Sequence, residues 1–403
     1  MTVYEVKSGV VSSGIHVDAG DLLAIERGGE ADGSVISGLG VGGPSGNGIM
    51  SDFGIARNTL ITAGGQAIIY GGGVAYGTIV DEGGSTTISQ GGAAFGTVLR
   101  GGMQVSSGGY TSGTIVSAGG GEGILSGGWS IGTIVLSGGA EGLASGTTHR
   151  TVVSSGGNET VFAGATSSTT ISQGGLELVE GGHSLATRIL SGGNEQITEG
   201  GAASGSLVSA GGQEIVSSGG IADATQIYKG GTLTVSSGGA VSGGLTFHAG
   251  SAIIDGSVGA GTVRFAGVVG TLDLNDVADF HAAISGFKGA TEKLDIGGFG
   301  FLEGETVSWK QLGTSGTLTI KGDEIAKLTL IGQYTASDFK LANDFHDGTY
   351  VKYLPPASAA TAPGRFAEAM AGFSGRAGAG MAVHSGGSAV TEPALITAVS
   401  SGH

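Results

Sequence analysis

The residues with the clearest chemical potential are six glutamates that recur at a fixed spacing. Each follows the first glycine of a glycine pair by three positions: Glu122, Glu141, Glu159, Glu177, Glu195 and Glu214. If successive copies stack as strands, these carboxylates lie about 4.8 Å apart, where two unit charges repel by roughly 1 kcal/mol in water. The row is therefore either a solvated acidic face that discourages lateral sheet pairing, or a ladder that gathers Ca²⁺ or a cationic partner. The calcium nonapeptide Gly-Gly-x-Gly-x-Asp is absent, so no metal site is assigned and the ladder stays the alternative.

The remaining candidates for chemistry do not form a catalytic constellation. Six of the eight histidines are scattered without metal-ligand spacing, at His16, His149, His183, His248, His281 and His346. Polysaccharide-cleaving solenoids pair carboxylates with basic residues in a groove. Here the basic residues of the repeats, such as Arg100, Arg150, Arg188 and Lys229, fall on other rows or coils than the glutamates. The sequence predicts no catalytic residues and no cofactor, and a carbohydrate-active enzyme is the alternative of another class.

Composition narrows the classes of protein further. The chain has 403 residues, of which 87 are glycine and none is cysteine, and its net charge is −16. The glycines have no three-residue period, which excludes collagen, and the missing cysteine excludes disulfides and thiolate metal sites. The negative charge argues against nucleic acid or an anionic membrane as a partner. No apolar run approaches the roughly 18 residues of a membrane span, so no membrane insertion is predicted.

The elements that position the glutamates come from an internal repeat. From Leu60 to Ile254 the sequence repeats every 18 or 19 residues, and a repeat of this size is typical of stacked architectures. The first glycine of each pair stands at Gly64, Gly83, Gly101, Gly119, Gly138, Gly156, Gly174, Gly192, Gly211 and Gly230. Glycine permits the positive backbone angles that tight corners require.

Three further rows keep the same register. One β-branched row is Val80, Val98, Val116, Val135, Val153, Ile171, Ile189, Val208 and Ile227, and a second is Ile69, Ile88, Val105, Ile124, Leu143, Val161, Val179, Ile197, Val216 and Val235. A row of small residues is Ala75, Ala94, Thr111, Ser130, Ser184, Ala203 and Ala222. β-Branched residues suit strands, and one coil cannot bury its own apolar residues. The prediction is an all-β fold, a β-solenoid with three short strands per coil, whose handedness stays open.

A threonine row also recurs, at Thr78, Thr97, Thr114, Thr133, Thr187 and Thr225, with an interruption at Ser206. Stacked threonines can form a hydroxyl ladder that stabilises a sheet. A flat threonine array could also match an ice lattice, although a single interrupted row argues against it.

The chain divides into four regions. Residues 1–59 are expected to form irregular N-terminal coils, with a loop from Gly38 to Asp52, and residues 60–250 the regular solenoid. Residues 251–353 are expected to form a β-rich C-terminal module with a short helix near 275–286 and a core of Phe299, Phe301, Trp309, Tyr334, Phe339 and Phe345. Residues 354–403 are expected to be a flexible Ala/Gly/Ser-rich tail, in which Phe366 to Phe373 is either a staple onto the module or part of a secretion signal.

The repeats resemble a known family. The pattern Thr-Ile-Val-x-x-Gly-Gly-x-Glu-x-Ile/Val-x-Ser-Gly-Gly, seen in 133–146, 151–164 and 206–220, is similar to the passenger repeats of AIDA-type adhesins. The resemblance implies an extracellular β-solenoid used in adhesion, autoaggregation or biofilm formation. It also implies O-linked heptoses, added by a glycosyltransferase, at Ser117, Ser137, Ser154, Ser155, Ser191 and Ser209. Serine beside a glycine pair is also simply a good turn residue.

The chain departs from that family in two respects. Its start has no basic-then-apolar signal, and it has no translocator barrel, which would need many alternating strands. The region 251–353, with Leu294 to Phe299 and Leu328 to Tyr334, is similar to C-terminal modules of bacterial type I secreted proteins. We therefore expect export to the extracellular space or cell surface without a cleaved N-terminal signal.

The functional expectation is a secreted bacterial structural or adhesin-like protein. Weak contacts repeated on successive coils would add up through effective concentration. The expected partners are other copies of the chain, cell-surface glycans, or both. A self-assembling extracellular fibre is the alternative within the same class.

Overall fold

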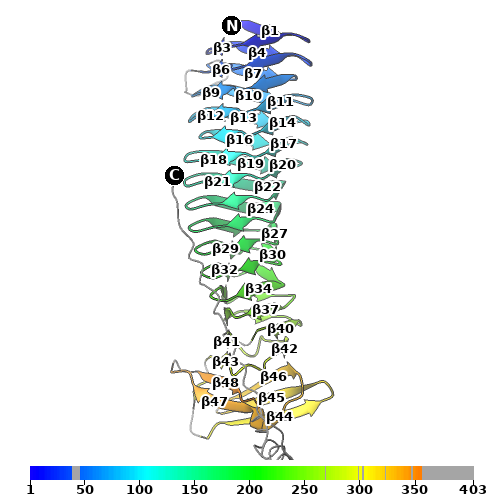
Figure 1. Ribbon diagram of the computed structural model, residues 1–403, viewed down its shortest axis with the longest axis vertical. Helices are drawn as coiled ribbons and strands as arrows, with labels where there is room; N and C mark the ends of the chain where they lie inside the picture. Colours follow the sequence, from blue (N-terminus) through cyan, green and yellow to red (C-terminus); the bar gives the residue numbers. More distant parts are fainter. Residues whose placement is uncertain are drawn as a thin grey trace, which may run out of the picture. The chain divides into compact units, whose positions relative to one another are not determined.

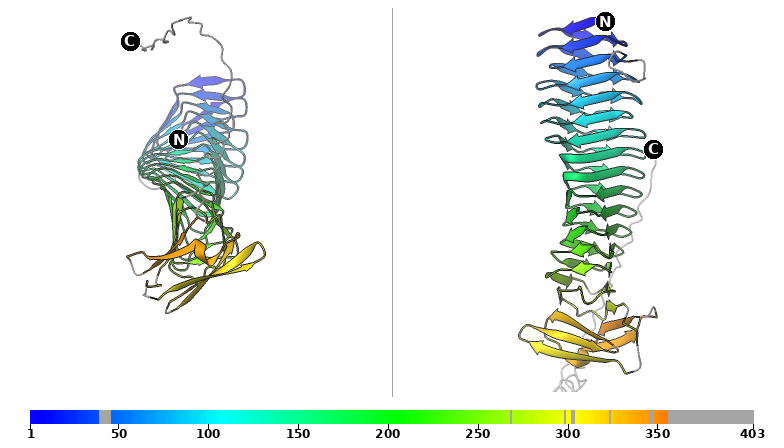
Figure 2. Two further views of the ribbon diagram at one scale, coloured as in Figure 1. Left: turned by 60° about the horizontal axis from the view of Figure 1, so that its bottom comes forward. Right: turned by 180° about the vertical axis from the view of Figure 1, so that it is seen from behind.

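The computed structural model describes residues 1–38, 46–267, 269–297, 299–301, 304–322, 324–345 and 348–355. Within them the chain is all-β, and the helical structure amounts to one 3-10 turn, η1 (Ala336–Asp338). The strands wind into coils that stack along one axis, which Figure 1 shows from the side and Figure 2 from two further directions. The predicted β-solenoid with three short strands per coil is confirmed.

From β1 (Val3–Val6) to β40 (Thr262–Phe265) each coil supplies one strand segment to each of three columns, and beyond β40 only the first and third columns continue. The first column is β1 (Val3–Val6), β4 (Leu22–Ile25), β7 (Ile49–Asp52), β10 (Gln66–Ile69), β13 (Ser85–Ile88), β16 (Gly102–Val105), β19 (Gly121–Leu125), the first halves of β22 (Ala140–His149) and β24 (Asn158–Ser167), β26 (Leu176–Val179), β29 (Asn194–Ile197), β32 (Gln213–Val216), β35 (Thr232–Val235), β38 (Ser251–Ile254), β41 (Val269–Leu274) and β43 (Thr291–Ile296). Successive strands of this column pair in parallel and in register.

The second column follows each first-column strand after a corner. It is β2 (Val11–Ser13), β5 (Glu30–Asp32), β8 (Ile55–Arg57), β11 (Val74–Tyr76), β14 (Ala93–Phe95), β17 (Tyr110–Ser112), β20 (Trp129–Ile131), the second halves of β22 and β24, β27 (His183–Leu185), β30 (Ala202–Ser204), β33 (Ile221–Asp223), β36 (Ala240–Val241) and β39 (Ser257–Val258). Its strands also pair in parallel.

The third column closes the coil. It is β3 (His16–Val17), β6 (Val35–Ile36), β9 (Leu60–Ile61), β12 (Ile79–Val80), β15 (Val98–Leu99), β18 (Ile115–Val116), β21 (Ile134–Val135), β23 (Val152–Val153), β25 (Thr170–Ile171), β28 (Arg188–Ile189), β31 (Leu207–Val208), β34 (Thr225–Tyr228), β37 (Leu245–His248), β40 (Thr262–Phe265) and β42 (Ala283–Ser285).

The core is a narrow interior filled by one or two residues from each strand. Val116, Val135 and Val153 lie one above another in the third column, and each is fully buried. The second β-branched row, from Ile69 to Val235, is also buried, and so is the small row. The prediction was wrong for one residue of the first β-branched row: Val98 is not buried, and its neighbour Leu99 fills the interior instead. The corner after Leu99 is two residues shorter than the corners after Val80 and Val116, because Gly101 occupies the place that the second glycine of the pair takes in other coils.

The solenoid is longer than the regular repeat. Parallel pairing begins at β1 and continues past residue 250 through β38, β41 and β43, so the strands described within 1–59 and 251–296 belong to the coils. Of the expected loop from Gly38 to Asp52, Ile49–Asp52 form β7, and residues 39–45 lie outside the described part of the chain. The glycine period disappears after 250, but inward-facing aliphatic residues still fill the columns.

The short helix expected near 275–286 is absent from the structure. Buried side chains there alternate at Phe280, Ala282 and Ile284, which is the period of a strand and not of a helix. Ala283–Ser285 accordingly form β42, which pairs in parallel with β40.

Antiparallel strands cover the last coil. A meander of β44 (Thr306–Leu312), β45 (Ser315–Lys321) and β46 (Ile325–Ile331) joins the third column where β46 pairs with β42. A hairpin of β47 (Phe339–Asn343) and β48 (Thr349–Tyr353) joins the first column where β48 pairs with β43. Of the expected aromatic core, Trp309, Tyr334 and Phe339 contact one another, whereas Phe301 and Phe345 are exposed. The expected tail and its Phe366 to Phe373 segment lie outside the described residues.

No helix among the described residues is long and apolar enough to cross a membrane.

Candidate functional site

The six glutamates lie inside the solenoid. Their side chains are 0–2% exposed, so the row is neither a solvated face nor a surface ladder for cations. Each is the second residue of its strand, or of the strand's first-column half, and the buried aliphatic residue is the fourth, as in Glu122 and Ile124. Residues two apart on a strand point to the same face. That spacing was visible in the sequence and places the glutamates with the core residues.

Hydroxyl groups from the second column and from the residue at or just before the start of each third-column strand surround the carboxyls. Glu122 accepts hydrogen bonds from Thr111 at 2.8 Å, from Thr133 at 2.9 Å and from Thr114 at 3.4 Å. Glu159 likewise accepts three, from Thr148, Thr166 and Thr169. The threonine row is therefore an interior row, which excludes an ice-matching surface, and four of its members donate to glutamates: Thr114, Thr133, Thr187 and Thr225. Thr151 and Thr169, which the sequence reading missed, belong to it.

The remaining four glutamates each accept one hydrogen bond. The donors are Thr151 to Glu141, Thr187 to Glu177, Ser206 to Glu195 and Thr225 to Glu214. In each of these carboxyls the second oxygen is buried without a hydrogen-bond partner. In the coils of Glu195 and Glu214, the second column supplies Ala203 and Ala222 where earlier coils supply a hydroxyl.

Burial sets the electrostatics of this column. Removal from water penalises the charged form of a carboxyl, so burial raises the pKa of all six glutamates above the ordinary value, and that of Glu195 to about 7. The pKa of Glu141 lies well above that value because Glu159 and Glu122 add repulsion to burial. Groups so enclosed cannot touch a substrate, and no three His, Cys, Asp or Glu side chains of the described residues are placed to share a metal ion.

The candidate serines fall at one corner of the coil. Ser137, Ser155 and Ser191 are exposed and directly precede the first glycine of the pair. The corner glycines hydrogen-bond from coil to coil, for example Gly156 N to Gly174 O at 2.8 Å, which holds these serines in one row. The coil between Ser155 and Ser191 carries Gln173 at this position.

The other three candidate serines, Ser117, Ser154 and Ser209, lie one residue earlier in the corner and are half-buried. The Ser117 hydroxyl donates to the carbonyl oxygen of Leu99 at 2.9 Å, so this side chain has a structural role. The structure thus separates the six serines into an exposed set and a partly covered set.

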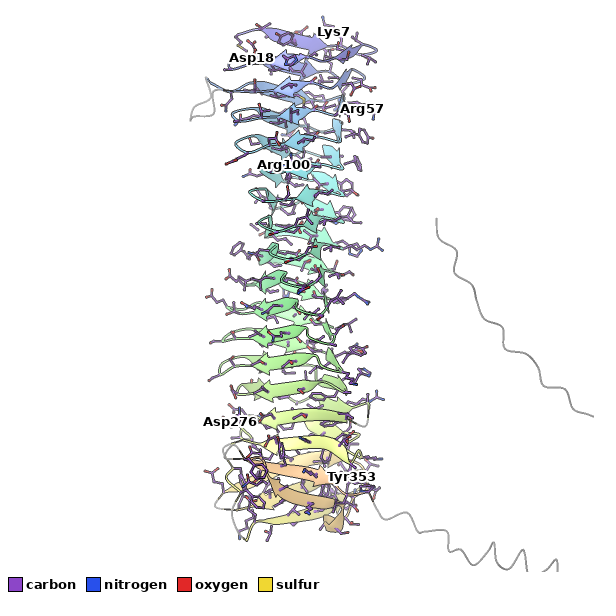
Figure 3. The ribbon with its side chains drawn as sticks, turned by 60° about the vertical axis from the view of Figure 1, so that its left-hand side comes forward. Lys7, Asp18, Arg57, Arg100, Asp276 and Tyr353 are labelled. Atoms are coloured by element: carbon purple, nitrogen blue, oxygen red, sulfur yellow. The ribbon has the colours of Figure 1, made fainter. Side chains whose placement is uncertain are left out.

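The outer surface carries few ion pairs. Arg57 contacts Glu30 at 2.6 Å and Arg100 contacts Asp81 at 2.9 Å, and each pair joins two neighbouring coils. Figure 3 labels the two arginines. Both pairs are partly exposed, and such pairs contribute little to stability. His149 contacts the Ser167 hydroxyl at 2.9 Å, and His183 is exposed.

An outward-facing aromatic column on the second strands was not recognised in the sequence. Tyr76, Phe95, Tyr110 and Trp129 lie on successive coils with ring centroids 5.2–5.7 Å apart, and Arg57 lies over the Tyr76 ring at 4.8 Å. Trp129 is 47% exposed. The signal was the recurrence of an aromatic residue beside the small row, directly after the small residue in two coils and directly before it in the next two.

No protein-family model matches the chain, and no curated protein matches it. Among solved structures, the chain is similar to the crystal structure of a TibA fragment that TibC has hyper-glycosylated. The two are 28% identical in sequence with a TM-score of 0.49, and the match covers 72% of this chain and 97% of that fragment. What this chain does has to be inferred from its own coils.

Proposed function

We propose that this chain is an extracellular, adhesin-like rod that acts without catalysis, by presenting one repeated surface to cells or to other copies of itself. The observation that carries the proposal is the regularity of the outer surface. In-register pairing from β1 to β43 repeats each outward position at about one strand spacing.

The mechanism follows from this repetition. One weak contact per coil becomes strong attachment when many coils engage the same surface, because binding of the second contact is intramolecular. The resemblance of the repeats to AIDA-type adhesins supports the same function. Cell-surface glycans and further copies of the chain are the partners that such a surface fits.

Assembly into an endless fibre is less well supported. Lengthwise growth needs open strand edges at both ends of the stack. At the C-terminal end of the coils, β43 pairs with β48 and β42 pairs with β46, so the ends of the first and third columns are covered.

A deletion of whole coils tests the proposal. Removing residues 140–175 deletes two coils and places Leu176 at the position that Ala140 held. Removing residues 194–231 also deletes two coils and places Thr232 at the position that Asn194 held. Beads coated with either variant should clump with one another and attach to cultured cells about tenfold less well than beads with the full chain. Equal losses from the two deletions are expected. A loss confined to one deletion would contradict a repeated surface and point to a singular site.

We further propose that the exposed serines are the sites of O-linked modification by a glycosyltransferase. Accessibility of the hydroxyl supports this, since the enzyme must reach it on a rigid corner. Peptide mass spectrometry of the natively produced protein should find Ser137, Ser155 and Ser191 occupied to a higher fraction than Ser117, Ser154 and Ser209. Equal occupancy in both sets would mean that modification precedes folding or ignores the coil.

A further inference from the structure

We propose that the buried glutamate column is a proton-binding array, in which Glu141 and Glu177 are held as neutral acids whose protons are donated to carboxylates in the neighbouring coils. This goes beyond adhesion, because it concerns what the interior binds and not what the surface contacts.

The register brings the six carboxyls into one line. Glu122 pairs with Glu141, and Glu141 with Glu159, at equivalent positions of adjacent strands. The same pairing continues to Glu177, Glu195 and Glu214. Neighbours are therefore about one strand spacing apart, within reach of a shared proton between flexible side chains. Met103 precedes the line and Leu233 follows it, so the column is closed by apolar residues at both ends.

Hydrogen bonding alternates along the first four members. Glu122 and Glu159 each accept three hydroxyl hydrogen bonds that engage both carboxyl oxygens, which stabilises the ionised form. Glu141 and Glu177 each accept one, on Oε2, and their Oε1 atoms are buried without a partner. A buried oxygen without a donor is costly, whereas a protonated oxygen is itself a donor.

Within the part of the chain that the structure describes, no Lys, Arg or His side chain is buried. The strands packed against the column contribute Thr111, Ser130, Thr148, Thr166 and Ser184 from the second column, and threonines, Ser206 and aliphatic residues from the third. Among the described residues, the buried charged side chains outside the column are Asp52, Glu292, Asp295 and Asp344, which are all acidic and lie in other coils or in the cap. The negative charge of the glutamate column is therefore neutralised by bound protons and not by basic side chains.

The protonated glutamates make the stability of the folded chain depend on pH. Burial raises the pKa of these glutamates, so at neutral pH the folded chain binds more protons than the unfolded chain. Their contribution to stability is complete below the ordinary glutamate pKa and is lost as pH rises through the raised values, which for Glu195 is about 7. Acid should therefore strengthen the coils and mild base weaken them.

Infrared spectroscopy of the full chain in D₂O at pH 7 tests the array, because a protonated carboxyl absorbs apart from a carboxylate. The folded chain should show a protonated-carboxyl band that disappears on unfolding in denaturant at the same pH. In the Glu141→Gln/Glu177→Gln variant the band should become clearly weaker, and what remains should come from groups such as Glu195 and Glu214, whose second carboxyl oxygens also lack a donor. The matched control is Glu199→Gln, an exposed corner residue in the left-handed conformation that Gln90 adopts elsewhere, and it should leave the band unchanged.

A second measurement uses the unmodified chain and does not depend on the variants folding. Refolding in weakly buffered solution at pH 7 should take up protons, seen as a rise in the pH of the solution. Absence of the band together with no proton uptake would overturn the proposal. Unfolding on treatment with a chelator would also overturn it, because the column would then hold metal ions instead of protons.

Discussion

Replacing Gly120 by alanine will destabilise the solenoid by about 3 kcal/mol or more, whereas the same change at Gly121 will be close to neutral. A Cβ atom at Gly120 would lie 2.3 Å from the carbonyl oxygen of Leu99 in the preceding coil. That oxygen is backbone, so it cannot move aside without separating the coils. At Gly121 a Cβ would meet nothing within 4 Å. An alanine there even removes some of the flexibility that glycine brings to a strand.

Denaturant unfolding followed by circular dichroism measures both variants against the unmodified chain. The two positions are adjacent in sequence, which makes the second variant a control for composition and local propensity. Similar losses at both positions would show that the corners do not pack against the preceding coil in the way that the structure has them.

Replacing Val135 by aspartate will cost about 4 kcal/mol, enough to disrupt the central coils. Val135 is fully buried between Val116 and Val153. The interior tolerates glutamates because hydroxyl groups donate hydrogen bonds to them. The hydroxyls nearest to Val135 already have acceptors, since Thr133 donates to Glu122 and Thr151 donates to Glu141. A carboxyl at Val135 would therefore be buried without a donor.

The control for this substitution is Ile134→Asp on the same strand. Ile134 points outward and is 37% exposed, so its replacement should change the free energy of unfolding by only about 1 kcal/mol. Thermal unfolding at a fixed pH distinguishes the two. A greater loss at Ile134 than at Val135 would mean that the third column faces the opposite way.

The repeat made the coil predictable, because stacking is the one way to bury rows such as Val116, Val135 and Val153. The glutamates were misplaced for a different reason. The spacing between Glu122 and Ile124 already put both on one face, but a row of carboxylates suggests water unless the hydroxyl partners are recognised at the same time. Those partners, Thr111 and Thr133, are 11 residues away on either side, and only the closed coil brings them together.

Two other predictions, the burial of Val98 and the end of the solenoid, were wrong for physical reasons as well. Val98 was assigned to the interior because glycine pairs were aligned without allowing for the shorter corner at Gly101. The end of the solenoid was placed near residue 250 because the glycine period ends there, although Leu272 and Leu294 continue the first column. Beyond residue 250 the buried aliphatic residues keep the strands in register although the glycine pairs are lost.

The account depends on coils that stack in register, and a disulfide between neighbouring coils measures this most directly. The chain has no cysteine, so a pair can be introduced without competition. Ile115 and Ile134 are partners in adjacent third-column strands, at a separation of about 4.8 Å that a disulfide can bridge, whereas Ile115 and Val152 are two coils apart. The Ile115→Cys/Ile134→Cys variant should cross-link under mild oxidation while Ile115→Cys/Val152→Cys stays reduced. Cross-linking of the second pair but not the first would contradict the stacking on which the whole account rests.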